Sequence, residues 1–155
     1  MRRKEKEIND ERVIEGILST AQVCRIAMVD DGVPYVVPVN FGYQDRILYV
    51  HSASAGRKID ALKRNNLVCF EMETESTIIK DPEACGWGTR CRSLIGYGRA
   101  ELIIERSAKK RALDIIMAHY GKTEPGEYDE RQLSALVILR IPIDTVTCKQ
   151  LGSWQ

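Results

Sequence analysis

Three strand-like segments follow one another between residues 22 and 51, and only tight turns separate them. The first, QVCRIAMVD, ends at the turn Asp30-Asp31-Gly32; the second, PYVVPVNFGY, ends at a Gln44-Asp45 turn that leads into ILYVH. Strands joined by such short turns pair antiparallel, because parallel neighbours need a crossover of a dozen or more residues. The segment therefore predicts an antiparallel sheet and argues against a doubly wound βαβ fold.

The remaining patterns add strands and a few helices. Further strands are expected at 67–73, 93–105, 135–143 and 145–150, and helices at 57–65 and 107–120, with another helix capped by Asn9-Asp10. Residues 75–92 are expected to be irregular, and 122–130 to be a polar loop. Pro38 predicts an edge strand or an irregular ladder. Together these patterns predict an α+β protein with a closed or nearly closed antiparallel barrel of about six or seven strands.

The length and charge of the chain limit its function classes. The 155 residues fit a single domain, 1–155, in which the charged residues 1–10 form a solvated N-terminal arm. Lys and Arg number 23 against 22 Asp and Glu, a balance that argues against nucleic-acid binding. The N-terminus has no apolar signal region, and no stretch approaches 18 apolar residues. We therefore expect a cytoplasmic protein without membrane contact.

The five cysteines are scattered along the chain and predict neither disulfides nor a metal site. They are Cys24, Cys69, Cys85, Cys91 and Cys148. An odd number without a signal peptide is typical of reduced thiols. The gap between Cys85 and Cys91 is not a zinc-knuckle spacing, and no histidine lies nearby, so no metal is expected.

Two cations open the helix expected at 57–65, and this is an unusual choice. Arg57 and Lys58 would each cost roughly 0.3–1 kcal/mol at an exposed helix start, because the first turn carries a partial positive charge. A bound anion would reverse the sign, and Gly56 would let a phosphate approach the backbone closely. The residues alone leave two interpretations open: a phosphate site, or side chains that extend into water.

A second group of polar residues lies in TRCRSLIG, residues 89–96. Strand alternation would put Arg90 and Arg92 on one face and Ser93 on the other. These residues are either a second source of cations for an anion or a solvated strand end.

The order and spacing of these segments resemble the flavin-binding split-barrel proteins related to pyridoxamine 5′-phosphate oxidase. The resemblance rests on PYVVPVNFGY, YVHSASAGRKIDALKRNN and RSLIGYGRAELI, and it covers nearly the whole chain. Within that superfamily the chain looks most like the 5-nitroimidazole-resistance branch. The resemblance implies a homodimer with FMN at the subunit interface, although some relatives bind FAD, a deazaflavin or haem.

The resemblance also implies which residues bind the cofactor. Pro38, Val39, Asn40 and Phe41 would run along the flavin ring; Tyr49, Val50, His51 and Ser52 would border the ring and ribityl chain; Gly56, Arg57 and Lys58 would hold the phosphate; and Arg92 and Ser93 would add polar contacts near the dimer interface. No equivalent of the oxidase's C-terminal arginine motif is found in DTVTCKQLGSWQ. Pyridoxamine phosphate is therefore not the expected substrate.

The implied activity is reduction of a small acceptor, such as a nitroaromatic or a quinone, with electrons from NAD(P)H. His51 is the candidate proton donor or substrate-orienting residue, because an imidazole exchanges protons near neutral pH. The alternative is a flavin- or haem-binding carrier or sensor without turnover. Trp87 and Trp154 are either flavin contacts or surface aromatics, and His119 is expected to be a favourable charge at a helix C-terminus.

Overall fold

The computed structural model describes residues 3–154, which form one mixed α and β unit. The strands are β1 (Glu7–Ile8), β2 (Cys24–Asp30), β3 (Val33–Val39), β4 (Gly42–Gln44), β5 (Ile47–Ala53), β6 (Leu67–Ile79), β7 (Gly88–Arg99), β8 (Glu101–Ile103) and β9 (Leu136–Leu151). The helices are α1 (Glu11–Thr20), α2 (Arg57–Arg64), α3 (Arg106–His119) and α4 (Glu130–Ala135), with short 3₁₀ turns at Lys4–Lys6 and Ala84–Gly86. The α+β class expected from the sequence is confirmed.

The strands form one antiparallel sheet in the order β3-β2-β6-β7-β9-β5-β4, and β1 and β8 also pair with β9. The edge position expected for the strand containing Pro38 is confirmed, because β3 pairs only with β2 among the described strands. The tight turns of residues 24–53 are likewise present, but the single strand expected at 34–43 is wrong: the chain leaves the ladder at Asn40 and Phe41, so β3 pairs with β2 and β4 pairs with β5. Asp10 caps α1 by accepting a hydrogen bond from the Arg12 backbone N–H.

One long strand, β9, connects the two halves of the sheet. Its first part pairs with β5, and its last part pairs with β7. The sequence predicted two strands here, yet the chain runs through Pro142 and Asp144 without a break and only shifts register opposite Gly98. A Cβ at Gly98 would collide with the Pro142 carbonyl oxygen, so this glycine lets β7 and β9 approach closely.

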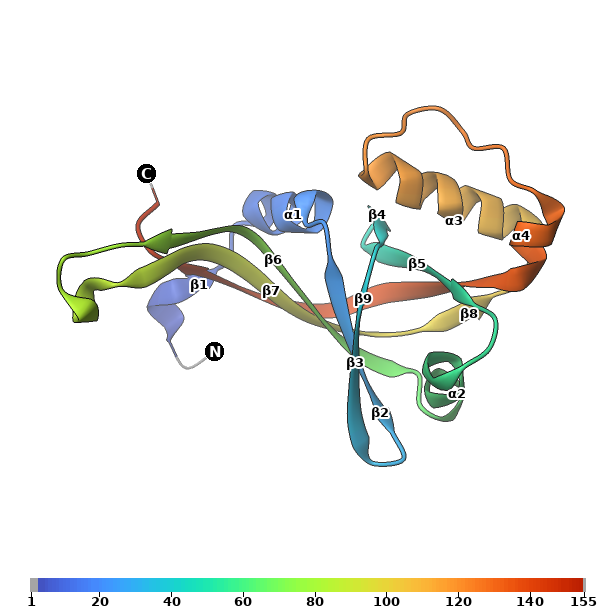
Figure 1. The fold of residues 1–155 in the computed structure, drawn as a ribbon, viewed down its shortest axis with the longest axis horizontal. Coiled ribbons are helices and arrows are strands. Elements are labelled where there is room, and N and C mark those ends of the chain that lie inside the picture. The colour runs from blue at the N-terminus through green and yellow to red at the C-terminus, as the bar shows by residue number, and fades with distance from the viewer. Residues whose placement is uncertain (1–2, 155) are drawn as a thin grey trace.

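The irregular segment expected at 75–92 is confined to residues 80–87, and the expectation is wrong for the residues on either side. β6 continues to Ile79 and β7 begins at Gly88, so a long hairpin extends away from the rest of the molecule (Figure 1). The β-branched residues Thr77, Ile78 and Ile79 favour an extended chain despite their polar neighbours. A bulge interrupts the pairing near Glu75, whose φ is 55°.

Three further expectations need correction. The strand expected at 93–105 begins earlier, at Gly88, and is interrupted at Ala100, so that β8 is a separate strand. Residues 7–8 of the N-terminal arm are not simply solvated, because they form β1 against β9 and Ile8 is buried; residues 1–2 lie outside the described part. The polar loop ends at Asp129, which caps α4 through the Arg131 backbone N–H. A helix thus precedes β9 where the sequence suggested loop and strand.

The hydrophobic core lies between the sheet, α1 and α2. Its largest fully buried side chains are Phe41, Phe70, Ile17, Leu18, Ile26, Leu48, Ile59, Met72, Leu94, Leu139 and Ile141. Burying each such side chain contributes roughly 1.5–3 kcal/mol. A smaller cluster beneath α3 consists of Ala112, Ile116 and Ile138. Phe70 packs against the face of Gly96, where any side chain would collide with its ring. This packing fixes the ends of β2 and β5 and the start of α2, where the candidate site lies.

Candidate functional site

The N-terminus of α2 is bare. Gly56 precedes the helix with a φ of 118°, a conformation that favours glycine, and no side chain in the described residues caps it. The first backbone bond of the helix runs from the Asp60 N–H to the Gly56 carbonyl. The N–H groups of Arg57, Lys58 and Ile59 therefore lack helical partners, and the positive end of the helix dipole is open to an anion.

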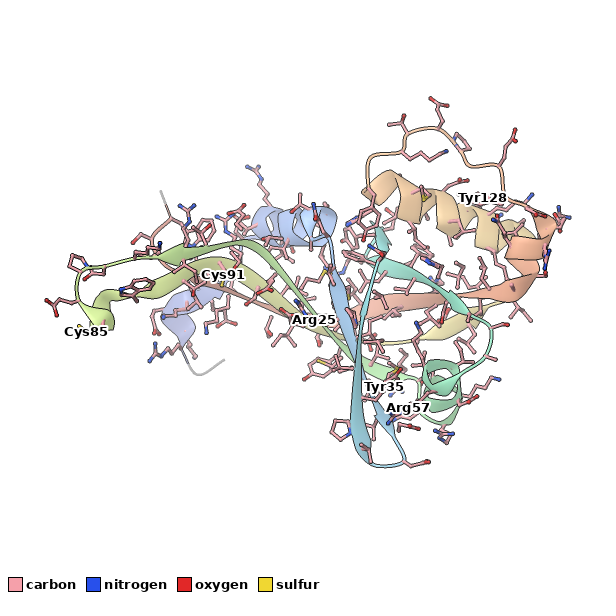
Figure 2. The ribbon with its side chains drawn as sticks, viewed as in Figure 1. Arg25, Tyr35, Arg57, Cys85, Cys91 and Tyr128 are labelled. Carbon is pink, nitrogen blue, oxygen red and sulfur yellow. The ribbon has the colours of Figure 1, made fainter. Side chains whose placement is uncertain are left out.

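Arg57, the first residue of α2, is held by two neighbours. Its Nε donates to Asp30 Oδ2 at 2.7 Å, and its guanidinium carbon lies 4.3 Å from the centre of the Tyr35 ring. Figure 2 shows Tyr35 and Arg57 together beside α2. The Arg57 hydrogen bond lowers the pKa of Asp30, and Arg64 lowers it further. Of the two interpretations left open by the sequence, a side chain that simply extends into water is therefore wrong for Arg57.

Lys58 is the uncompensated cation of the pair. Its side chain is half-buried, and among residues 3–154 no carboxylate lies within ion-pair distance of its ammonium group. Burial lowers the pKa of Lys58 below its ordinary value. A half-buried cation next to a bare helix N-terminus fits a phosphate group, which would neutralise both.

A shallow depression of about 420 Å³ lies over this helix start. Its lining consists of Tyr35, His51, Ser52, Ala53, Ala55, Gly56, Arg57 and Lys58. His51 is exposed on β5, while Ser52 points the other way and is buried. Five of the residues predicted to bind the cofactor thus share one depression: His51, Ser52, Gly56, Arg57 and Lys58.

The segment from Pro38 to Phe41 lies outside that depression. Pro38 and Val39 end β3 opposite Arg25 and Cys24. Asn40 is exposed, and its Nδ2 donates to the Tyr120 hydroxyl at 3.1 Å. Phe41 is fully buried, and its backbone N–H donates to the same hydroxyl at 3.2 Å. The Phe41 side chain thus belongs to the core, and its amide already has a partner.

Tyr49 and Val50 do not line the depression. Val50 is fully buried in the main core, and Tyr49 packs partly buried against the cluster beneath α3. The Val50 side chain is thus not available to a ligand, whereas Tyr49 lies on the same face of β5 as His51. Their place in the cofactor site stays a prediction.

Arg92 and Ser93 lie far from Arg57 within one chain. They pair with Gln150 and Lys149 of β9, whereas His51 pairs with Ile138. Ile138 and Gln150 are twelve residues apart, or up to roughly 40 Å along an extended strand. Figure 2 agrees: Cys91 lies towards the hairpin and Arg57 at the opposite end. Both residues remain predicted contacts, and only a second chain could bring them to the site.

The two tryptophans and His119 have other contacts in the chain. The Trp154 ring lies 4.0 Å from the Arg92 guanidinium carbon, and Trp87 is exposed in the β6–β7 connection, where its Nε1 donates to the Asp81 carbonyl. His119 is more than a C-terminal charge: its Nε2 lies 2.8 Å from the Ala21 carbonyl oxygen, and its ring packs on Phe41.

The five cysteines form no disulfide among the described residues. All five are free thiols, and burial raises the pKa of Cys24 to about 12 and that of Cys148 to about 11. Within residues 3–154, no three His, Cys, Asp or Glu side chains gather as a metal site would require. No helix in this part of the chain is long and apolar enough to cross a membrane.

Sequence reasoning missed Asp30 and Tyr35. Asp30 was assigned only to a turn, and Tyr35 only to a strand. The available signal was the β2–β3 hairpin itself: with the observed register, its turn end carries an acid and an aromatic ring. The sequence offered nothing to place that end beside α2.

Comparison with known proteins agrees with this architecture. The model of the pyridoxamine 5′-phosphate oxidase family matches residues 10–150. A proposed 5-nitroimidazole antibiotic resistance protein from Bacteroides thetaiotaomicron has a similar structure, with a TM-score of 0.83, 35% identity, and coverage of 93% of this chain and 86% of that one.

Two more distant structures share the fold. They are an FAD- and haem-binding protein from Mycobacterium smegmatis (TM-score 0.84, 23% identity, covering 96% of this chain and 75% of that one) and an FAD-binding protein from Mesorhizobium loti (TM-score 0.70, 24% identity, covering 95% and 98%). No functionally curated protein matches the sequence significantly. The family model and the 35% identical structure show that this chain belongs to the pyridoxamine 5′-phosphate oxidase family and has its split-barrel fold.

Proposed function

We propose that this chain is a flavin-dependent oxidoreductase that binds FMN with its phosphate at the start of α2. The observation that carries the proposal is the half-buried, uncompensated Lys58 beside a bare helix N-terminus. Family membership and the similarity to the Bacteroides nitroimidazole resistance protein support it.

The residues at this end of α2 suit a phosphate. The three free N–H groups would donate to its oxygens, and Lys58 would supply a nearby positive charge. Arg57 uses Nε for Asp30, so its terminal nitrogens remain for a ligand. Charge-assisted hydrogen bonds of this kind contribute roughly 1.5–3 kcal/mol each.

The chemistry would take place at the exposed edge of β5. A bound flavin supplies electron transfer from a reduced nicotinamide to a small acceptor, for which we propose a nitroaromatic or a quinone. His51 is exposed on the rim of the depression, where its imidazole could orient the acceptor or donate a proton to it. Tyr35 and Arg57 would border the depression on its other side.

We further propose that the protein works as a homodimer with flavin between the subunits. Arg92 and Ser93 cannot reach Arg57 in their own chain, as the pairing along β9 requires. In a homodimer, Arg92 of the partner subunit would approach the depression of the first subunit across the interface. Sedimentation velocity of the purified protein would test this; a flavin-bound monomer would contradict it.

The absorption spectrum of the purified protein tests the cofactor. We expect flavin bands, and NAD(P)H oxidation that requires an added nitroimidazole or quinone. Flavin that no nicotinamide reduces would instead favour a carrier or sensor, and a Soret band would identify haem. A colourless protein that does not bind added FMN would refute the proposal.

Replacement of both cations tests the phosphate assignment. Arg57→Ala combined with Lys58→Ala should weaken FMN binding by far more than about twofold, since two charge-assisted contacts are lost. Lys63→Ala is the matched control, because Lys63 is an exposed cation near the other end of the same helix. Equal affinities for the double variant and the control would place the phosphate elsewhere.

A further inference from the structure

The Asp30 carboxylate contacts both ends of α2. Its Oδ2 accepts from Nε of Arg57, the first residue of the helix, and its Oδ1 accepts from Nη2 of Arg64, the last. These two residues lie about 10 Å apart along a helix axis. Asp30 ends β2, so one side chain attaches the whole helix to the β2–β3 hairpin.

The hairpin also fixes the orientation of the Arg57 guanidinium. Asp30 holds the Nε edge at 2.7 Å, and the Tyr35 ring covers one face at 4.3 Å. Arginine presents five N–H groups in a rigid fork, so a bond at Nε leaves the outer edge for another acceptor. A side chain restrained in this way loses less freedom when a ligand binds.

The negative charge of Asp30 does not argue against a nearby anion. Two arginines share this carboxylate, and Lys58 adds a third cation without a carboxylate partner in the described residues. The carboxylate of Asp31 faces Arg64 at 3.3 Å and forms no ion pair with Arg57. With Asp60 in the first turn of α2, the three acids match the three cations in number, but Lys58 is the cation without a carboxylate partner among the described residues.

We propose that Asp30 is a positioning residue of the phosphate site: it holds Arg57 and the N-terminus of α2 in the geometry that binds the FMN phosphate. This inference rests on the proposed function. Asp30 itself does not touch the ligand; it acts through Arg57, with Tyr35 as the second support.

The chain offers a closely matched pair of variants for the test. Asp30→Asn and Asp31→Asn remove the same charge one residue apart, but only the first removes the bond to Arg57. We expect Asp30→Asn to weaken FMN binding about three- to fivefold, and Asp31→Asn to change it by less than about 1.5-fold. Quenching of FMN fluorescence gives both dissociation constants.

A double-variant cycle separates positioning from a general loss of structure. In the Arg57→Ala background, Asp30→Asn should cause no further loss, because the group that it positions is gone. As a single change, Tyr35→Leu should weaken FMN binding, because the ring over Arg57 is lost. Tyr35→Phe keeps the ring and should bind FMN as the unaltered protein does. Should Asp30→Asn fail to fold, equal FMN binding by Tyr35→Leu and Tyr35→Phe would show that the orientation of Arg57 does not matter and would overturn the proposal.

Several results would overturn the inference. Unchanged or tighter FMN binding by Asp30→Asn would mean that the carboxylate is neutral to, or competes with, the phosphate. If Asp30→Asn weakened FMN binding equally in the wild-type and Arg57→Ala backgrounds, Asp30 would have a purely structural role. In both cases the unaltered protein binds FMN and the proposed function stands. An unaltered protein that binds no FMN would refute the function and the positioning role together.

Discussion

Lys58 gives the sharpest test, because removing its charge should affect the free and the ligand-bound protein in opposite directions. In the free protein the ammonium is half-buried beside the positive end of the α2 dipole, with no carboxylate partner among the described residues. Lys58→Met keeps the apolar stem and removes the charge. The free protein should become more stable by about 0.3–1 kcal/mol, which raises its melting temperature by about 1–4 °C.

The same variant should bind FMN less tightly. Loss of the Lys58 contact should cost roughly 1–2 kcal/mol in an open depression, which is about five- to thirtyfold in affinity. Lys63→Met is the control: it removes a charge from the last turn of α2, where a cation is favourable. It should leave FMN binding unchanged and lower stability slightly.

Two measurements on flavin-free protein test the opposite effects expected for Lys58→Met. A thermal melt gives the stability, and an FMN titration by fluorescence quenching gives the affinity. The reasoning is refuted if Lys58→Met lowers the melting temperature of the free protein. It is also refuted if FMN affinity stays within about twofold of the unaltered chain.

Three further predictions concern the scaffold. Gly98→Ala should destabilise the protein by about 1–3 kcal/mol in chemical denaturation, because the new methyl group meets the Pro142 carbonyl; unchanged stability would mean that β9 can shift. Tyr120→Phe should cost about 1–3 kcal/mol, because the Phe41 amide loses its acceptor; a melting temperature equal to wild type would contradict this. Glu105 caps α3, and hydrogen bonds from Ser107 and Ala108 lower its pKa to about 2. Its stabilisation is therefore present above pH 4.5 and lost as the pH falls towards about 2, so the difference in melting temperature between Glu105→Ala and wild type should narrow in acid.

The sequence predicted the scaffold where local chemistry decides it. Strand alternation and tight turns located β2, β3 and β5, Pro38 marked an edge strand, and Asp10 marked a helix start. The extent of the β6–β7 hairpin was missed because Glu73–Ile79 carries polar residues among the β-branched ones. There, pairing with β7 rather than any local pattern keeps the chain extended.

The candidate site was predictable only in its contiguous part. His51 to Lys58 lie within eight consecutive residues, so a strand end followed by a helix start brings them together. The bond between Asp30 and Arg57 joins residues 27 positions apart, and no periodicity reports such a contact. The relation of Arg92 and Ser93 to the site remains a prediction, because it depends on a second chain.

The long strand β9 has a consequence for how this protein is made. β7 and β5 are not neighbours in the sheet; each lies against β9, which comes after both in the chain. Until residues 136–151 have left the ribosome, both strands present open edges, and edges of this kind promote association between nascent chains. Closure therefore depends on contacts between distant parts of the chain, which slows folding. Both edges should thus stay exposed until β9 has been made and has paired with β7 and β5.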